Sequence, residues 1–296
     1  MRITVCQLPD ESADFESAWI ALVEHASAQR SDILVLPEMP FYTWPCDQPT
    51  FDPHQWQSSL SAHRVWTKRL PELRVKGVLS SMPVEENGRR FNAGFVWSQP
   101  AGVRIVHRKH FLPEMAGFFE RTWFSRGPAE FESEDLAGAK IGFAVCTELW
   151  AMEVARHYCR RGVHLLVTPR ATGGESVDKW IAAGRTAAVI AGAFAVSSNR
   201  FSFERKFGGV GWIFGPDGEV LGLTNEREPF ITVDCALAIA DNAKSTYPRS
   251  ALNLAQYRSK HLTKVTTKVT RADAHSRPSG RWCVRGSKKF AKSAKT

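Results

Sequence analysis

Residues 1–235 alternate between two hydrophobic patterns. Short runs rich in Val, Ile and Phe predict strands, and apolar residues at helical spacing, such as Phe15, Trp19 and Leu22, predict helices between them. The alternation of strands and helices, followed by hairpins, predicts an α/β fold with a mixed sheet. Strands are predicted at residues 3–8, 32–36, 77–81, 92–97, 104–107, 140–145, 164–168, 193–198, 211–214 and 230–233. Helices are predicted at residues 14–29, 56–70, 150–161 and 178–191, and a turn between two strands at residues 215–222.

The pattern stops near residue 258, where large apolar residues become rare and Lys, Ser and Thr dominate. We therefore expect one domain over residues 1–255, followed by a basic, disordered tail at residues 256–296. From Arg258 onward the chain holds twelve Lys and Arg and one acid, so its formal charge of +9 belongs to the tail. Two interpretations of the tail stay open, namely weak non-specific binding of polyanions and a solvated extension.

The N-terminus and the cysteines exclude several classes of protein. The first residues lack the features of a signal peptide, so we expect none, and no apolar run reaches the roughly 18–20 residues that span a bilayer. Six cysteines occur without a CxxC motif or a close Cys/His spacing, which argues against a structural zinc site and against disulfides. We expect a cytoplasmic protein with free thiols.

One of these cysteines, Cys146, lies where a predicted strand gives way to a predicted helix. A helix N-terminus favours the thiolate, and the N–H groups of its first turn, beginning with Thr147, can donate to a developing oxyanion. A small core cysteine fits the same position equally well. The position alone therefore leaves both interpretations open.

Two further strand ends carry ionisable residues. Glu38 follows the strand at 32–36, and Lys109 follows the strand at 104–107. A carboxylate can take the proton of a thiol, and a lysine between carboxylate and thiolate offsets their repulsion and stabilises a developing oxyanion. Taken singly, Glu38 also fits a surface carboxylate and Lys109 one cation among basic neighbours.

Glu38, Lys109 and Cys146 together resemble the nitrilase superfamily of carbon–nitrogen hydrolases. The matching stretches are LVLPEM, HRKHFLPE and KIGFAVCTELWAMEVAR, and the resemblance covers residues 1 to about 250. It implies a nitrilase-like four-layer αββα sandwich, with residues 1–255 as the hydrolase domain, and a homodimer or higher homo-oligomer. It assigns Glu38 as general base, Lys109 as cationic stabiliser and Cys146 as nucleophile. This chemistry needs no metal and no organic cofactor.

The family often has a second glutamate downstream of the lysine. The segment GFFERTWF resembles that part of the family and makes Glu120 the candidate. Glu114, in LPEM, lies closer to the lysine in sequence and competes with it, although an exposed loop acid is the simpler interpretation of that residue.

Departures from the family pattern bear on the substrate. Nitrile-cleaving members commonly have Trp after the nucleophile, and Thr147 stands there in this chain. We therefore expect hydrolysis of a small linear amide or N-carbamoyl compound, through a thioester, with release of ammonia or an amine. One alternative is a nitrilase that converts a nitrile to the acid. Another is a non-catalytic scaffold whose basic tail binds nucleic acid or an acidic partner.

The substrate contacts are predicted with less specificity. Arg170 follows a predicted strand end and could pair with a substrate carboxylate, but a structural ion pair at the sheet rim fits as well. Thr147 is a candidate through its position after the nucleophile. Aromatic side chains could line an apolar pocket, or belong to the core or to a subunit interface. These aromatic candidates are Tyr42, Trp44, Phe118 and Trp150.

Overall fold

The structure is a computed structural model that describes residues 1–204 and 206–251. The predicted tail at residues 256–296 and the domain boundary at residue 255 lie outside the described residues. The description below concerns residues 1–251, which form one compact unit.

The first sheet has the strand order β10-β1-β2-β3-β4-β5, and β13 also pairs with β1. Strand β1 runs parallel to β2, antiparallel to β13 along its first half and parallel to β10 along its second half. The sheet is therefore mixed, as the sequence predicts. Its strands are β1 (Arg2–Pro9), β2 (Ile33–Val35), β3 (Gly77–Glu86), β4 (Arg89–Ser98), β5 (Gly102–Arg108), β10 (Asn199–Phe201) and β13 (Phe230–Asp234).

The second sheet has the strand order β12-β11-β9-β8-β7-β6. Strands β7, β8 and β9 are parallel, and antiparallel strands complete both edges. Its strands are β6 (Ser133–Leu136), β7 (Ala139–Phe143), β8 (Leu165–Val167), β9 (Phe194–Ser197), β11 (Trp212–Phe214) and β12 (Val220–Leu223). Strand β12 begins at Val220, inside the turn predicted at residues 215–222, so the turn between β11 and β12 is shorter than predicted.

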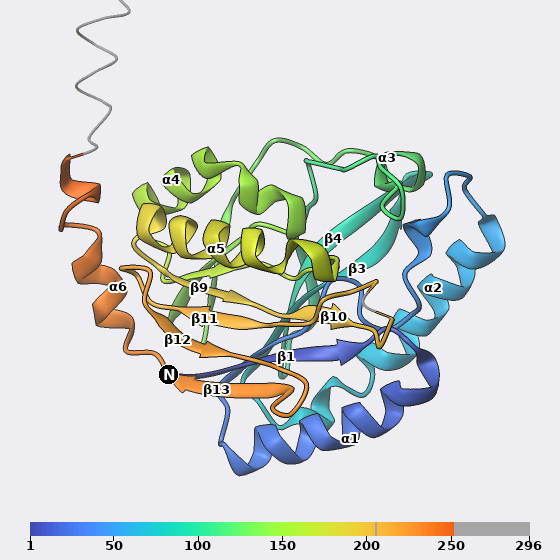
Figure 1. The fold of residues 1–296 in the computed structure, drawn as a ribbon, viewed down its shortest axis with the longest axis horizontal. Helices are drawn as coiled ribbons and strands as arrows, with labels where there is room; N and C mark the ends of the chain where they lie inside the picture. The colour runs from blue at the N-terminus through green and yellow to red at the C-terminus, as the bar shows by residue number, and fades with distance from the viewer. Residues whose placement is uncertain (205, 252–296) are drawn as a thin grey trace, which may run out of the picture. The chain divides into compact units, whose positions relative to one another are not determined.

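Helices cover the outer faces of the two sheets (Figure 1). Trp19 and Leu22 of α1 pack against Leu34 and Val78 of the first sheet, while α4 and α5 pack against the second sheet. The four layers confirm the predicted αββα sandwich. The helices are α1 (Ser12–Ala28), α2 (Pro53–Thr67), α3 (Glu120–Trp123), α4 (Met152–Arg160), α5 (Val177–Ala191) and α6 (Leu237–Ala243).

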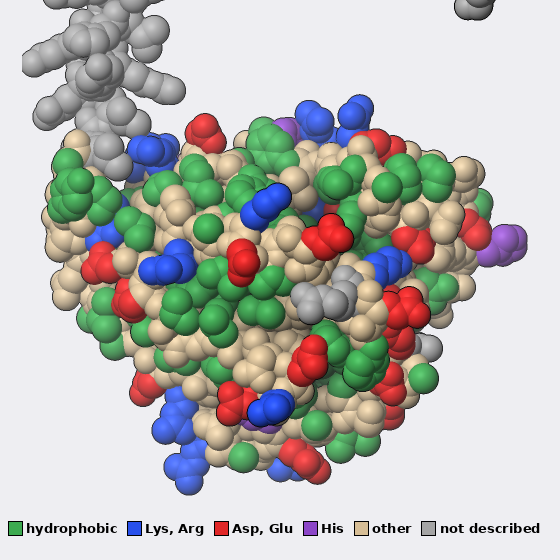
Figure 2. Space-filling view, viewed as in Figure 1, with side chains coloured by type: hydrophobic (Ala, Val, Ile, Leu, Met, Phe, Trp, Pro, Cys, Tyr) green, Lys and Arg blue, Asp and Glu red, His purple; other side chains and the backbone are tan. Residues whose placement is uncertain are grey.

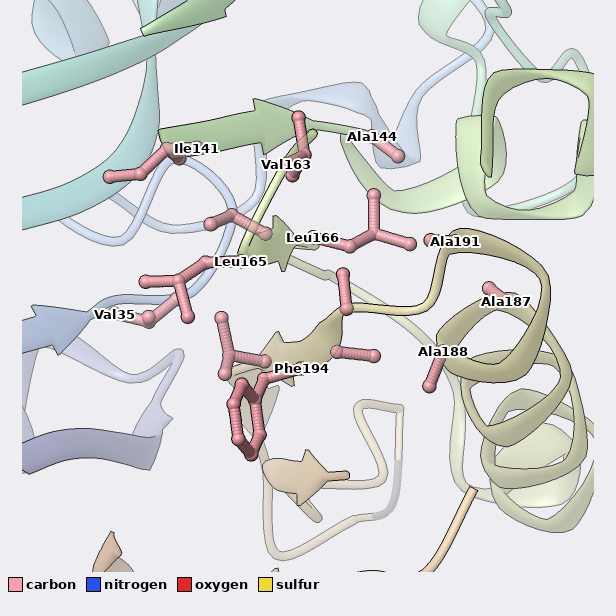
Figure 3. Close-up of a cluster of buried hydrophobic side chains, with 14 of the residues drawn as sticks. Val35, Ile141, Ala144, Val163, Leu165, Leu166, Ala187, Ala188, Ala191 and Phe194 are labelled. Atoms are coloured by element: carbon pink, nitrogen blue, oxygen red, sulfur yellow. The ribbon is translucent and has the colours of Figure 1, made fainter. Parts of the chain in front are cut away.

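The main core lies between the two sheets and beneath α5. Figure 3 shows Leu165 and Ile141 near Val35 of the first sheet, while Leu166 lies on the side of Ala187 in α5. Strand side chains alternate between faces, so consecutive residues of β8 serve two different interfaces. Full burial of a large aliphatic side chain stabilises the fold by about 1.5–3 kcal/mol. The same packing fixes the strand ends that carry the candidate catalytic residues.

Some predicted boundaries are wrong, each for a local reason. The helix predicted at 150–161 begins at Met152, because Cys146–Trp150 forms a 3-10 helix first. The helix predicted at 56–70 begins earlier, at Pro53, because the Asp52 carboxylate caps it by accepting from the N–H groups of His54 and Gln55. Strands β6 and β10 and helix α6 were not predicted, since each is too short to show a hydrophobic period.

The surface of the described part mixes charges of both signs. On the face in Figure 2, acidic and basic side chains are interspersed with small apolar patches. In residues 1–204 and 206–251, none of the helices combines the length and apolarity that crossing a bilayer requires.

Candidate active site

The candidate catalytic residues follow the ends of three strands. Glu38 comes after β2, Lys109 directly after β5, and Cys146 after β7. Main-chain hydrogen bonds connect these ends: Glu38 N–H donates to Arg170 C=O at 3.2 Å, and Cys146 N–H donates to Pro169 C=O at 3.0 Å. Pro169 and Arg170, which follow β8, therefore connect the end of β2, where Glu38 lies, to the end of β7, where Cys146 lies.

Lys109 joins two glutamates at the centre of the site. Its Nζ donates to Glu38 Oε1 at 2.7 Å, and to Glu120 Oε1 and Oε2 at 2.8 and 2.9 Å. The side chains of all three residues are almost completely inaccessible to solvent. A buried charge must be paired and hydrogen-bonded to be tolerated, so this cluster is held in one arrangement.

Burial and charge act against each other in this cluster. Burial favours the neutral amine of Lys109, but the charges of Glu120 and Glu38 outweigh it and raise the pKa of Lys109 well above its usual value. Burial, together with the charge of Glu38, raises the pKa of Glu120 to about 7 despite the attraction of Lys109. The lysine is therefore the permanent cation of the site.

The raised pKa of Glu120 predicts a pH dependence of stability. Between pH 4.5, its usual value, and pH 7, folded Glu120 retains a proton that the unfolded chain has lost. Stability therefore falls as pH rises through this window, by at most about 3 kcal/mol. In Glu120→Gln we expect this part of the slope to disappear, as measured by urea unfolding from pH 4.5 to 7.5. The exposed Glu114→Gln should keep the wild-type slope, and equal slopes in wild type and Glu120→Gln would contradict the assignment.

Cys146 occupies a strained turn at the end of β7. Its φ is +49°, in the left-handed region that residues other than glycine rarely adopt, and its side chain is buried. Burial first, and then the charge of Glu38, raises the pKa of the Cys146 thiol. The prediction that a helix N-terminus favours the thiolate is wrong here, because α4 begins only at Met152. The resting thiol keeps its proton and needs a base.

Groups suited to that chemistry lie at the same place. Glu38 Oε1 accepts from Lys109, whereas the buried Glu38 Oε2 has no hydrogen-bond partner in the described part of the chain. The main-chain N–H of Thr147 also has no acceptor among those residues. The site thus offers one carboxylate oxygen to take a proton and one N–H group to donate to an oxyanion.

A cavity of about 210 Å³ reaches this cluster. Cys146, Thr147 and Glu120 lie at its base, and Met115, Phe118 and Trp180 form apolar walls. Residues 115–118 close on themselves through paired main-chain hydrogen bonds between Met115 and Phe118, and Trp44 Nε1–H holds Gly117 C=O at 3.1 Å. The loop between Lys109 and Glu120 therefore forms one side of the cavity.

The predicted substrate contacts divide into two groups. Thr147 and Phe118 line the cavity, whereas Tyr42, Trp44, Trp150 and Arg170 do not. Trp150 is 47% exposed and packs against the outer side of the site through Trp180, with ring centroids 5.0 Å apart. Tyr42 contributes its C=O to Arg200, and Trp44 packs in the core beside Phe118. Arg170 is buried, and its guanidinium donates to the protein acceptors Ser197 Oγ and Thr172 Oγ1.

The structure also separates the two candidate glutamates. Glu120 opens the short helix α3 and contacts Lys109. Glu114 is exposed, and its carboxylate accepts from the N–H and the hydroxyl of Thr122 instead. Glu114 therefore stabilises the loop in front of α3 and stays outside the charged cluster.

A family profile described as carbon–nitrogen hydrolase matches residues 2–245, nearly the whole described part. The chain belongs to the carbon–nitrogen hydrolase family. This confirms the predicted family and the predicted class of enzyme.

Several curated relatives of this carbon–nitrogen hydrolase have amidase-type names, and another is named glutamine-dependent NAD(+) synthetase. A citrullinase from Francisella tularensis is 26% identical over 217 residues, which cover 69% of this chain and 75% of the relative. An N-carbamoylputrescine amidase from Solanum tuberosum is 27% identical over 50% of this chain, and the alignment spans 55% of that relative's length.

Solved structures share the fold. A carbon–nitrogen hydrolase from Helicobacter pylori G27 superposes with a TM-score of 0.77 at 20% identity, over 88% of this chain and 98% of that one. A mutant form of an amidase from Nesterenkonia sp. AN1, which carries the acetamide moiety of fluoroacetamide on its active-site cysteine, gives a TM-score of 0.67 at 20% identity, over 86% and 96% of the two chains.

Sequence reasoning missed Asn92 of the hydrolase. Its Nδ2 donates to Glu38 Oε1 at 2.7 Å and approaches Glu120 Oε2 at 3.5 Å, and its C=O accepts from Lys109 N–H at 2.9 Å. Asn92 thus fixes both glutamates and the main chain of the lysine. The available signal was a buried asparagine within the apolar run FNAGFVW of β4.

A second missed residue is Glu148, two positions after the nucleophile. Its fully buried carboxylate lies 2.7 Å from His107 Nε2 and accepts from the N–H groups of His110 at 2.7 Å and Val145 at 2.8 Å. His107 and His110 flank Lys109, whereas Val145 precedes Cys146. Through these contacts, Glu148 connects the segment around Lys109 to the turn that carries Cys146.

Removing the Glu148 carboxylate is expected to lower both stability and activity. Glu148→Ala removes the carboxylate that the N–H groups of Val145 and His110 and the ring of His107 contact, so we expect about 3–5 kcal/mol lower stability. We also expect a reduced kcat in the fraction that stays folded, since the nucleophile turn loses its support. Urea unfolding and steady-state kinetics measure the two effects. Glu153→Ala removes an exposed acid of α4 and serves as the control, and a loss below about 1 kcal/mol in Glu148→Ala would refute the role.

Proposed function

We propose that this enzyme hydrolyses a small linear amide or N-carbamoyl compound through a thioester on Cys146. The observation that supports it best is the bridge of Lys109 between Glu38 and Glu120, because Glu120 lines the same small cavity as Cys146. A buried thiol, a base and a permanent cation are the groups that acyl transfer from an amide requires.

In the first step, Sγ of Cys146 attacks the carbonyl carbon. Glu38 Oε2 takes the thiol proton as the S–C bond forms, because the raised pKa keeps the resting thiol protonated. Negative charge then develops on the substrate oxygen. Lys109 Nζ and the N–H of Thr147 donate to it, and one such donor typically lowers the barrier by about 3 kcal/mol.

In the second step, the C–N bond breaks and the nitrogen leaves with the proton that Glu38 received. This leaves a thioester between Cys146 and the acyl group. Glu38 then takes a proton from a water molecule, the hydroxide attacks the thioester carbon, and the acid leaves as the thiol takes its proton back. An N-carbamoyl compound follows the same steps at its carbamoyl carbon.

Glu120 acts through Lys109 in this scheme. Both its oxygens accept from Nζ, so it orients the ammonium towards the position of the substrate oxygen. Glu120 is a positioning residue, whereas Glu38, Lys109 and Cys146 contact the reacting atoms.

Two observations favour amides over nitriles. Thr147 stands where nitrile-cleaving members commonly have Trp. Several curated relatives carry the names citrullinase, N-carbamoylputrescine amidase and omega-amidase. We therefore propose amide hydrolysis, and the test below includes nitriles as the alternative substrates.

The test is a panel of linear amides, N-carbamoyl amines and nitriles, with ammonia release assayed for wild type and Cys146→Ser. We expect wild type to release ammonia from amides or carbamoyl compounds and Cys146→Ser to be inactive on them. Release from nitriles alone would replace the amidase proposal by a nitrilase. No release from any compound would favour the scaffold alternative.

A further inference from the structure

The cavity above Cys146 is small and bounded mostly by carbon. Its volume of about 210 Å³ is below the roughly 300–1,000 Å³ of pockets for drug-sized ligands. Met115, Phe118 and Trp180 line it with apolar surface, and Ala171, Thr172 and Gly173 form the wall next to the nucleophile. The acyl chain of a substrate therefore has space for few atoms and meets mostly carbon.

No charge in this lining is free to bind a substrate. Apart from Cys146, Glu120 is the one ionisable residue that the described part of the chain contributes to the cavity wall. Both Glu120 oxygens already accept from Lys109, so the charge of this carboxylate is paired within the protein before a substrate ammonium could approach it. A charged end of a substrate would lose its hydration without gaining a partner.

Arg170, the cation predicted to pair with a substrate carboxylate, is 1% exposed and hydrogen-bonds to the protein through all three of its nitrogens. Its Nε donates to Ser197 Oγ and its Nη1 to Thr172 Oγ1, both at 2.8 Å, and its Nη2 donates to Val210 C=O. The guanidinium also lies 3.7 Å from the ring centre of Trp212. Arg170 supports the cavity wall through its hydrogen bond to Thr172, and its guanidinium does not line the cavity where a substrate carboxylate could reach it.

We infer that the site selects amides or N-carbamoyl compounds whose chain is short and uncharged, and discriminates against chains of the same length that end in a carboxylate or an ammonium. The inference rests on the proposed function and names its substrate class. Citrulline and N-carbamoylputrescine, the compounds in the names of two relatives, both carry charged ends. This chain is therefore expected to process both poorly.

The experiment compares three amides that share a chain and differ at its end: valeramide, 4-carbamoylbutanoate and 5-aminopentanamide. We expect kcat/KM for valeramide to exceed that for each charged amide at least about tenfold. Equal or higher kcat/KM for a charged amide would overturn this inference alone. No ammonia from any of the three would overturn the proposed function, and the inference with it.

A charge added to the wall tests the physical cause. Met115 lines the cavity and is 61% exposed, so a lysine at this position can lay its stem along the apolar wall and keep its ammonium hydrated beside the cavity. Met115→Lys should raise the ratio of kcat/KM for 4-carbamoylbutanoate to that for valeramide at least about fivefold. Met115→Gln has similar length without charge and should leave this ratio near that of wild type. The same ratio in both variants would show that wall charge does not control selection and would overturn the inference.

Discussion

Replacing Cys146 by alanine is expected to lower kcat by at least about 10⁴-fold and to leave the fold intact. The variant keeps Glu38, Lys109 and the N–H of Thr147 but has no atom that can form the thioester. Only Sγ is lost from a buried position, so we expect a stability change of about 1 kcal/mol. Ammonia release from a working substrate measures kcat, and urea unfolding measures the fold.

A second buried cysteine provides the control. Cys235 is fully buried and hydrogen-bonds through its N–H to Met1 at the start of β1, far along the strand from the Glu38 end of the sheet. Cys235→Ala should keep kcat within about twofold of wild type. If Cys146→Ala retained more than a tenth of wild-type kcat, another group would have to be the nucleophile.

Lys109→Met is expected to lower kcat by about 10³-fold or more and also to destabilise the fold by about 3–5 kcal/mol. Methionine has similar length but no charge, so the developing oxyanion loses a donor. Glu38 and Glu120 then face each other in a buried site without the cation between them. The destabilisation should increase as pH rises, because Glu120, whose pKa is raised in the folded protein, then loses the proton that would relieve its repulsion with Glu38.

The control for this variant is an exposed lysine in an ion pair. Lys76 Nζ lies 2.8 Å from Asp32 Oδ1, but the lysine is largely solvated. Lys76→Met should cost less than about 1 kcal/mol and leave kcat unchanged. A mild effect of Lys109→Met on kcat, with normal stability, would mean that the oxyanion is stabilised elsewhere.

The sequence predicted the fold and the charged cluster well, because both follow from strand patterns. Hydrophobic runs predicted most strands of both sheets. Glu38, Lys109 and Cys146 became candidates because each follows the end of a predicted strand. The family resemblance turned these positions into an αββα sandwich, and Glu120 lies beside Lys109 as that resemblance implied. Their catalytic roles, the homo-oligomer and the cytoplasmic location stay predictions.

The sequence could not predict where side chains point. Arg170 follows a strand end as the catalytic candidates do, but Ser197 and Thr172, which bind its guanidinium, come from other parts of the chain. The ionisation of Cys146 depends on burial and on Glu38, which outweigh any local helix effect. Asn92 contacts Glu38, which lies 54 residues away in the sequence, and Glu148 contacts His107, which lies 41 residues away. No local sequence pattern reveals contacts over such separations.

The most direct test of covalent catalysis is rapid-quench mass spectrometry of the wild-type enzyme during turnover of a working amide. We predict that a fraction of the protein gains the mass of the acyl group, and that peptide mapping places it on Cys146. Cys146→Ala should gain no such mass under the same conditions. An acyl group on a different residue, or undiminished turnover by Cys146→Ala, would contradict the account.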